Sequence, residues 1–482
     1  DLFKKSMSLK LYNASSLLEV FKLREKNILI TDTINKRKIT YEQFLNFSSN
    51  TLNKLKTEKK IKPGDKVLIS MENSVEFLIL IFACLLGGYV AVPIDPNLPK
   101  DRYDNLKKMI KPKIVIKKIK IKKNIKKIKE KLSTSKKPFL ILFTSGTTGE
   151  PKGILLENNK YISAAFSYAR MCEYDFNSKI YHCLPMFYNA GMINIFFAGL
   201  AAGSNIVIGP RVNSLNLFSL IDNLKLNRIN SIHLTPEIFN TLNKIYENRN
   251  FEKEELKNIQ IISTASYLHE ETRENFENKF GARILNCYGI TEVGGPLTLQ
   301  KWENTYFENS VGQHAKEIKF LIYKRKKMNK IFVKSPYIMM GYILPNGRFE
   351  KPKLNKNYYD TGDIGNYENG QLFITGRRQD IIKKGGEILS LNVLDNICKK
   401  IKNVDDCVHL NLEDIDKGNK IMLFVKFKKI EKIDIELEKL NLDLKKELRN
   451  IELPDKIYPV PLIPKLFNGK INKSLLKEIY LI

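Results

Sequence analysis

Residues Leu142 to Gly153 read Leu-Phe-Thr-Ser-Gly-Thr-Thr-Gly-Glu-Pro-Lys-Gly, and no other stretch says as much about the architecture and chemistry of the chain. The segment continues the apolar run Phe139–Phe143, so a buried strand is predicted to open into a loop of glycines and hydroxyl side chains. Glycine lets the backbone approach an anion closely, and successive N–H groups form a concave anion site. We therefore predict a phosphate-binding loop.

The order of residues in this loop excludes two common phosphate-binding patterns. The Walker pattern needs Lys directly after the second glycine of Gly-x-x-x-x-Gly, and the dinucleotide pattern needs Gly-x-Gly-x-x-Gly; the loop has neither. A flexible Ser/Gly linker would have a similar composition, but not the order Ser-Gly-Thr-Thr-Gly-x-Pro-Lys-Gly. The hydroxyl donors and the positive charge of Lys152 favour a loop that holds phosphate groups.

Four more segments complete a set of motifs along the chain. They read Tyr-Gly-Ile-Thr-Glu at 288–292, Tyr-Asp-Thr-Gly-Asp at 359–363, Gly-Arg-Arg-Gln-Asp-Ile-Ile-Lys-Lys-Gly-Gly-Glu at 376–387 and Pro-Lys-Leu-Phe-Asn-Gly-Lys-Ile at 464–471. With the loop, and in this order, they resemble the motifs of the adenylate-forming superfamily, which includes acyl- and aryl-CoA ligases, luciferase-like enzymes and the adenylation domains of peptide synthetases. Weaker landmarks at 92–96 and 184–191 extend the resemblance over nearly the whole chain.

Length and patterning predict more than one domain. The chain has 482 residues, too many for a single ordinary core, and 43% of them are hydrophobic. Helix and strand patterns alternate in the first third of the chain, and short strands follow Gly312. We expect an α/β fold: a large N-terminal domain, residues 1–376, of stacked helix-covered β-sheets with a small β-subdomain, then a small α+β lid, residues 377–482, which the resemblance implies is mobile.

Cysteine spacing and hydropathy bear on the location of the protein. The six cysteines are scattered, without Cys-x-x-Cys pairs or a metal-ligand spacing, so we expect free thiols in a reducing, cytoplasmic compartment. Residues 77–94 carry no charge and are long enough to be considered as a membrane span. Gly87-Gly88 divides this stretch, so we expect a helix, a turn and a buried strand, and no transmembrane segment.

Much of the net charge of +29 lies in the segment Lys107–Lys137. Such a segment is compatible with an anionic membrane, an acidic carrier protein or nucleic acid as a partner. The segment contains no aromatic residue on which bases could stack, and lysine is abundant throughout the chain. We expect a solvated basic surface, while nucleic-acid binding stays the alternative from another class of function.

The resemblance implies how ATP and Mg²⁺ are bound. Thr291 would contact the α-phosphate, and Glu292, with Thr147, would hold Mg²⁺, a cation that prefers carboxylate and phosphate oxygens. The β- and γ-phosphates would be held by the loop residues Thr144, Ser145, Gly146, Thr147, Thr148, Gly149 and Lys152.

The same resemblance implies contacts to the nucleoside. Asp363 would accept hydrogen bonds from the ribose hydroxyls, because an ionised carboxylate can accept two from a vicinal diol. Arg377 would assist at the ribose or the phosphate. Tyr288 would stack on adenine, in a pocket that includes Ser266.

Lys470 is the residue that the resemblance implies for catalysis of adenylation, together with Thr291 and Glu292. Its ammonium would bridge the carboxylate and the phosphate, and because it lies beyond the hinge, motion of the lid would deliver or withdraw it. The sequence departs from its relatives at two positions here. Gln379 stands where the family commonly has Asp or Lys, and Leu391 stands where many CoA ligases have proline.

The motif around Tyr188 bears on the substrate. Phe187-Tyr188-Asn189-Ala190-Gly191 resembles a stretch of fatty and aryl acid CoA ligases, with Tyr188 in place of their His. Peptide-synthetase domains that activate α-amino acids usually have Asp directly after this Phe, so we expect an acid without an α-ammonium group. The function we expect is acyl-adenylate formation followed by transfer to CoA; the alternative is transfer to the phosphopantetheine of an acidic carrier protein.

Overall fold

The computed structural model describes residues 14–121, 136–144, 151–212, 216–246, 256–302, 307–325, 328–384, 387–414, 418–430, 432–465 and 471–481. The chain divides into two compact units, residues 1–319 with 333–359 and residues 320–332 with 360–482. We call them the N-terminal unit and the C-terminal unit. The second unit therefore takes in a short segment well before residue 377, the position at which the lid was predicted to begin.

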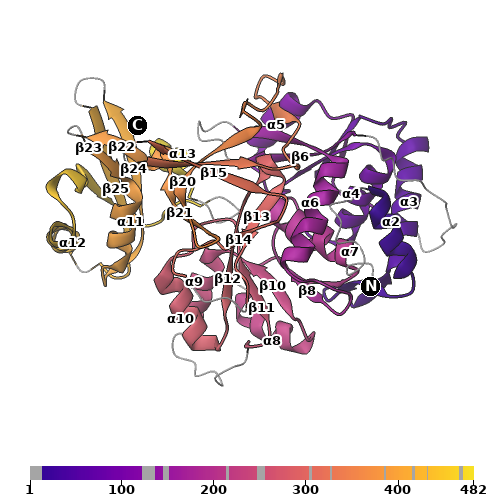
Figure 1. The fold of residues 1–482 in the computed structure, drawn as a ribbon, viewed down its shortest axis with the longest axis horizontal. Coiled ribbons are helices and arrows are strands. Elements are labelled where there is room, and N and C mark those ends of the chain that lie inside the picture. The colour runs from indigo at the N-terminus through magenta and orange to yellow at the C-terminus, as the bar shows by residue number, and fades with distance from the viewer. Residues whose placement is uncertain are drawn as a thin grey trace. The chain divides into compact units, whose positions relative to one another are not determined.

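In the described residues, the N-terminal unit contains a sheet in the order β14-β13-β12-β11-β10-β8-β9-β1-β2 (Figure 1). Strand β1 pairs in parallel with β9, so that Ile30 lies opposite Ile206. The bounds of these strands are β1 Ile28–Asp32, β2 Arg37–Thr40, β8 Lys179–His182, β9 Asn205–Ile208, β10 Ser231–Leu234, β11 Gln260–Ser263, β12 Ile284–Ile290, β13 Gly295–Leu299 and β14 Gln313–His314.

A second sheet of this unit runs β18-β17-β7-β6-β4-β3-β5 among the described residues. It contains β6, the strand predicted from the apolar run before the phosphate loop. The bounds are β3 Lys66–Ser70, β4 Val90–Ile94, β5 Ile114–Ile116, β6 Pro138–Thr144, β7 Lys152–Glu157, β17 Gly341–Ile343 and β18 Phe349–Glu350.

Helices α3 (Tyr41–Thr57) and α4 (Val75–Gly87) show how local sequence fixes this unit. Thr40 caps α3 by accepting from Gln43 N–H, while the Gln43 side chain accepts from Thr40 N–H, a reciprocal capping box. Helix α4 is buried on all sides, and it ends where Gly88 takes the left-handed conformation, with φ of +65°. The predicted helix, turn and strand in residues 77–94 are thus confirmed.

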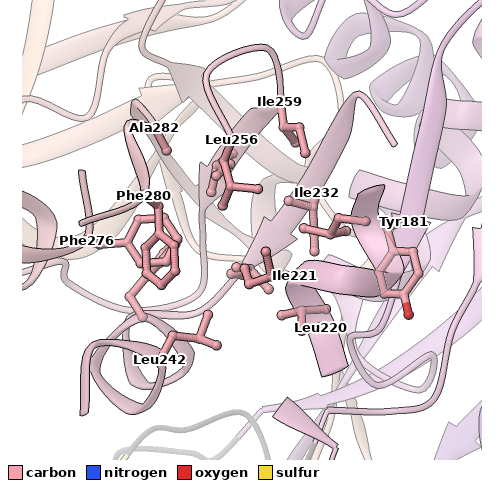
Figure 2. Packing of buried hydrophobic residues seen from close by; sticks show 14 of the residues in the cluster. Tyr181, Leu220, Ile221, Ile232, Leu242, Leu256, Ile259, Phe276, Phe280 and Ala282 are labelled. Atoms are coloured by element: carbon pink, nitrogen blue, oxygen red, sulfur yellow. The ribbon is translucent and has the colours of Figure 1, made fainter. Parts of the chain in front are cut away.

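Helices on the sheets bury the remaining apolar faces. Figure 2 shows one cluster, in which Phe276 and Phe280 of α10 lie close to Leu242 of α9, and Ile232 of β10 belongs to the same cluster farther toward Tyr181. The rings of Phe276 and Phe280 lie 4.5 Å apart between centroids. The other helices of this unit are α2 Ala14–Leu23, α5 Lys100–Ile110, α6 Asn158–Met171, α7 Ala198–Ala202, α8 Leu220–Leu226, α9 Pro236–Ile245 and α10 Glu270–Phe280, with a π-helix η1 Ala190–Phe197 and 3-10 turns η2 Leu217–Ser219 and η3 Thr291–Val293.

The C-terminal residues form an α+β arrangement. One sheet runs β15-β16-β20-β19, with β21 beside β20, and a hairpin and a three-stranded sheet follow among the described residues. Helices α11 and α12 pack on the last sheet through an apolar cluster that includes Leu394, Leu423 and Leu440. The bounds are β15 Lys319–Arg325, β16 Met328–Lys334, β19 Leu354–Asn355, β20 Tyr358–Glu368, β21 Gln371–Arg377, η4 Arg378–Asp380, β22 Ile381–Lys384, β23 Glu387–Ser390, α11 Leu391–Lys400, β24 Val404–Asp414, β25 Gly418–Phe427, α12 Ile433–Glu447, η5 Asn450–Glu452, β26 Lys456–Pro459 and α13 Lys473–Tyr480.

The expected α/β fold class is confirmed, and so is the expectation of free cysteines, since all six are buried and unpaired. Among the described residues, no helix has both the length and the apolar character needed to cross a bilayer. Residues 122–135 of the basic segment Lys107–Lys137 lie outside the described residues, so the solvated surface predicted for the whole segment stays a prediction.

Candidate active site

Strands β6 and β7 form the base of the predicted phosphate loop. They pair antiparallel, and Thr144 lies opposite Lys152 at the end of the pairing. Gly153 is tightly enclosed, because a Cβ at this position would lie 2.9 Å from Ile141 Cγ2. The structure thus places Lys152 at the mouth of the loop. The side chain of Thr144 and the predicted site residues Ser145, Gly146, Thr147, Thr148 and Gly149 lie outside the described residues.

Tyr342 of β17 connects Lys152 to the Thr-Glu motif. The Lys152 ammonium lies 5.7 Å from the centroid of the Tyr342 ring, and the Tyr342 hydroxyl donates to Glu292 Oε1 at 3.4 Å. The same hydroxyl shares a hydrogen bond of 2.6 Å with that of Tyr359. Burial raises the pKa of Tyr342 to about 12, and the Glu292 carboxylate adds to the shift. Two predicted site residues that are 140 positions apart in sequence, Lys152 and Glu292, are therefore joined by a tyrosine that the sequence analysis missed.

The Tyr-Gly-Ile-Thr-Glu motif crosses from strand β12 into the 3-10 turn η3. Gly289 is required there, since a Cβ would lie 2.2 Å from the carbonyl oxygen of Gly295 on the neighbouring strand. The turn ends at Gly294, with φ of +98°, a conformation that favours glycine. Tyr288, Thr291 and Glu292 are all half-buried. Backbone geometry thus fixes where the motif presents its side chains.

The predicted adenine pocket includes Ser266, and the hydrogen bond of its side chain does not link it to another predicted site residue. Ser266 donates to Glu237 Oε1 at 3.4 Å, so its hydroxyl faces a residue that the sequence analysis did not single out. Two residues away, Thr264 is buried and accepts from the Asn194 amide at 3.4 Å. Ala265 between them has φ of +78°, which is strained for a residue with a Cβ. This strained turn follows β11 directly.

Asp363 and Arg377 come together in the C-terminal unit. They lie opposite each other in the pairing of β20 and β21, and Arg377 Nε is 3.2 Å from Asp363 Oδ1. The Asp363 side chain is only 3% exposed, whereas that of Arg377 is 46% exposed. A second pair lies beside the first, since Arg378 Nη1 donates to Asp360 Oδ2 at 2.7 Å. The two motifs that carry these residues are therefore one structural feature.

Two further predictions concern the C-terminal unit. Lys470 lies outside the described residues, and so does the side chain of Gln379. Leu391 is the first residue of α11 and is buried in the core of the unit. Proline is well tolerated at the first position of a helix because the N–H there has no partner within the helix. Leucine, which this chain has, and proline, which many CoA ligases have, can therefore both begin a helix at position 391.

The segment around Tyr188 borders a buried ion pair. Arg211 lies over the Phe187 ring, 5.2 Å from its centroid, and its Nη2 is 3.8 Å from Asp95 Oδ2. Burial raises the pKa of Tyr188 to about 12, with a further contribution from Asp95. Asp95 belongs to the landmark at 92–96, but the sequence does not indicate that it approaches Tyr188.

Glu292 is the residue whose chemistry fits the expected Mg²⁺. It offers a half-buried carboxylate next to the base of the loop, and Mg²⁺ is often bound by one or two carboxylates together with substrate phosphates. Within the described residues, no group of three or more His, Cys, Asp or Glu side chains is placed to hold a metal ion. The second predicted ligand, Thr147, lies outside them.

This fold and these motifs define an adenylate-forming enzyme. The chain belongs to the AMP-binding enzyme family, whose model matches residues 22–137 and 127–343. The match contains β6, β7, Tyr288, Thr291 and Glu292.

Curated relatives include enzymes of two kinds. The chain is 28% identical over 374 residues to a malonate–CoA ligase of Arabidopsis thaliana, a match that covers 71% of this chain and 60% of the ligase. It is 25% identical to an oxalate–CoA ligase of Saccharomyces cerevisiae, over 71% of this chain and 63% of the ligase. It is 24% identical to bacitracin synthase 3 of Bacillus licheniformis, over 91% of this chain and 7% of the synthase. In each case the match spans less than two thirds of the relative.

Solved structures establish the fold over nearly the whole chain. ATP-bound MatB from Rhodopseudomonas palustris superposes with a TM-score of 0.85 at 20% identity, covering 97% of this chain and 99% of MatB. The anthranilate CoA ligase AuaEII in complex with anthranoyl-AMP superposes with a TM-score of 0.83 at 16% identity, covering 98% of both chains.

Proposed function

We propose that this chain is an ATP-dependent carboxylic acid ligase of the acid–thiol class. In the first step, a carboxylate oxygen attacks the α-phosphorus of ATP, and the bond to pyrophosphate breaks to give an acyl-adenylate. In the second step, the thiol sulfur of CoA attacks the acyl carbon, AMP leaves, and the thiol proton is released. The observation that carries the proposal is the arrangement of Lys152, Tyr342 and Glu292 at the base of the phosphate loop.

The roles of the residues follow from charge. A triphosphate and a carboxylate repel each other, so the site must supply positive charge and oriented donors. Lys152 and the loop would hold the β- and γ-phosphates, and Glu292 would hold Mg²⁺, which neutralises phosphate charge when bound. The Tyr342 hydroxyl, by donating to Glu292, would fix the orientation of that carboxylate. Thr291 would contact the α-phosphate.

The C-terminal unit would supply the remaining groups. Asp363, held by Arg377, would accept hydrogen bonds from the ribose hydroxyls, and Tyr288 of the N-terminal unit would stack on adenine beside Ser266. Lys470 would bridge the reacting carboxylate and phosphate. We retain residues 377–482 as the mobile lid of this proposal, so that its movement separates the two half-reactions.

The acid should lack an α-ammonium group. Tyr188 stands where an amino-acid-activating site would have Asp, and the buried carboxylate that interacts with it, Asp95, is paired with Arg211. Malonate, oxalate and anthranilate are the first acids to test, because the names of the similar ligases contain these acids. Transfer to the phosphopantetheine of a carrier protein is the second candidate, since the match to bacitracin synthase 3 spans 91% of the chain and the matches to the two CoA ligases span 71%.

ATP–pyrophosphate exchange tests the first step. We expect exchange with at least one of malonate, oxalate, anthranilate, octanoate and benzoate, and none with phenylalanine. Lys470→Ala should lower the exchange rate at least about a thousandfold, the scale of a lost transition-state charge contact, while calorimetry still detects binding of ATP with Mg²⁺. Wild-type exchange in this variant would overturn the assignment of Lys470. Incubation of the active acid with CoA or with a phosphopantetheinylated carrier then shows which thiol is acylated.

A further inference from the structure

A network of charged side chains, mostly buried, joins four segments of the C-terminal unit. Lys473 donates from Nζ to Asp380 Oδ1 at 3.0 Å and lies 3.1 Å from His409 Nε2. His409 Nδ1 lies 2.8 Å from Asp395 Oδ2, and the His409 backbone N–H donates to Asp395 Oδ1 at 2.9 Å. We call these four residues the Lys473 network. They come from η4, α11, β24 and α13, so the network fixes the positions of four elements at once.

Three members of the network are well shielded from water, whereas the Lys473 side chain is 37% exposed. The His409 side chain is 3% exposed, and those of Asp380 and Asp395 are each 14% exposed. Burial raises the pKa of Asp380, but His409 and Lys473 outweigh it and bring the pKa down to about 2. Burial lowers the pKa of His409, yet Asp395 and Asp380 more than offset it, so this pKa lies above its ordinary value. The network therefore sets two carboxylates against the Lys473 ammonium and a histidine whose protonated form they favour.

Stability alone does not explain such a network. Buried ion pairs often contribute no more than apolar residues of the same volume, and their best-attested use is to specify one arrangement among several. Lys473 and Asp380 are 93 positions apart in sequence, and apolar packing between η4 and α13 would fix their separation less strictly. The network is thus suited to fixing the position of α13 relative to the turn η4.

The two elements that Lys473 joins are those that matter most for the proposed reaction. Asp380 ends the turn η4, which follows Arg377 directly at the predicted hinge. Lys473 opens α13, three residues after Lys470. The chain on either side of residues 466–470 is also held, because Lys465 and Ile471 form an antiparallel bridge and Asn472 N–H donates to the Pro464 carbonyl at 2.8 Å.

We propose that Lys473 is a positioning residue for adenylation: through its ion pair with Asp380 it fixes the start of α13, and with it the attachment of the segment that carries Lys470, to the turn at the hinge. The inference rests on the proposed function, in which Lys470 acts only in the first half-reaction. Lys473 itself touches neither ATP nor the acid in this assignment. Its loss should therefore affect one half-reaction and spare the other.

The test compares Lys473→Met with Lys473→Arg and with Lys477→Met, which removes an exposed lysine from the same helix. ATP–pyrophosphate exchange is measured with the acid of the named panel that the wild type uses fastest. We expect Lys473→Met to lower exchange about 10- to 100-fold, because a shift of about 1 Å in a catalytic group has an effect of that order. Lys473→Arg should recover most of the rate, and Lys477→Met should match the wild type.

A second readout separates positioning from folding. Thioester formation from the preformed acyl-adenylate of the same acid should stay within about threefold of wild type in Lys473→Met, since Lys470 is not needed for that step and a misfolded unit would impair both steps. A third readout is the pH profile of exchange. Deprotonation of His409 leaves the two carboxylates with Lys473 alone, so the wild type should lose exchange on the alkaline side with a step that His409→Gln lacks.

Three outcomes are distinguishable. Wild-type exchange in Lys473→Met, or equal losses in both half-reactions, would overturn this inference while leaving the proposed function in place. If the wild type showed no exchange with any acid of the panel, the proposed function would fall and this inference with it. Selective loss of exchange in Lys473→Met, with recovery in Lys473→Arg, would establish the positioning role.

Discussion

The buried histidines of the two units differ in what surrounds them. His182 and His233, in the central sheet of the N-terminal unit, are fully buried, and burial lowers the pKa of each to about 3. His409 of the C-terminal unit is nearly as buried, but two carboxylates face it and its pKa is raised. The same side chain at the same depth is therefore held neutral in one unit and stabilised as a cation in the other. Burial sets the cost of charge, and the neighbours decide the protonation state.

This contrast extends to the candidate site. In the N-terminal unit, Tyr342 and the backbone around Gly289 position the site groups, mainly by hydroxyl contacts and close packing. In the C-terminal unit, ion pairs such as Asp363 with Arg377 do so. Substitutions should therefore have unequal effects in the two units, and the largest should come from an unpaired charge.

The strongest test removes a carboxylate from His409. Asp395→Ala should lower the free energy of unfolding by about 3 kcal/mol, because it breaks a buried pair and leaves Asp380 as the one described carboxylate that faces His409. Urea unfolding at pH 7 measures the change. The control is Asp443→Ala on α12. Asp443 pairs with Lys446 at an exposed position, so its loss should lower the free energy of unfolding by less than about 1 kcal/mol. Equal effects in the two variants would contradict the assignment of a buried charge network to the C-terminal unit.

A pH series tests the opposite behaviour of the two kinds of histidine. An unfolded histidine takes up its proton near pH 6.5, whereas His182 does so only near pH 3, so stability falls as pH drops below about 6.5. One such group contributes a slope of about 1.4 kcal/mol per pH unit. His182→Asn should reduce the slope of the unfolding free energy between pH 6 and 4 by about that amount.

His409 should act on the other side of neutrality. Because its pKa is raised, the stability that it contributes is complete below about pH 6.5 and is lost as the pH rises through the folded value. His409→Gln should therefore flatten the alkaline limb of the same series and leave the acid limb unchanged. An acid-limb change in His409→Gln, or none in His182→Asn, would remove the distinction between the two units.

The smallest expected effect concerns a single hydroxyl group of the N-terminal unit. Tyr342→Phe removes the hydroxyl that meets Glu292 and Tyr359, and should lower the free energy of unfolding by about 1 kcal/mol. Tyr323→Phe on β15, where the side chain is 52% exposed, should change it by less than about 0.5 kcal/mol. A loss in Tyr342→Phe as large as that in Asp395→Ala would mean that Tyr342 holds a buried charge.

Local sequence predicted those parts of the fold that depend on local physics. Gly87-Gly88 divided an apolar stretch into helix and strand. The motifs identified the family and the end of β6. In each case the deciding residues lie within a few positions of the feature that they determine.

The contacts that the sequence did not reveal depend on register between distant segments. Tyr342 reaches Glu292 only because β17 pairs with β7, and Asp363 meets Arg377 through the register of β20 and β21. The sequence does not distinguish His409 from other histidines in strands, because its partners Asp395 and Lys473 come from the distant helices α11 and α13. Contacts of this kind between distant segments cannot be predicted from residue spacing or residue type in a single sequence.

The parallel pairing of β1 with β9 has a consequence for synthesis of the protein. Strand β1 has to wait for the partner residues Ile206–Ile208 before it can join the central sheet. At about 5–20 residues per second, this wait is on the order of ten seconds or longer. During translation, the apolar residues Leu29 and Ile30, which end fully buried, stay without that neighbour until residues 206–208 have been made.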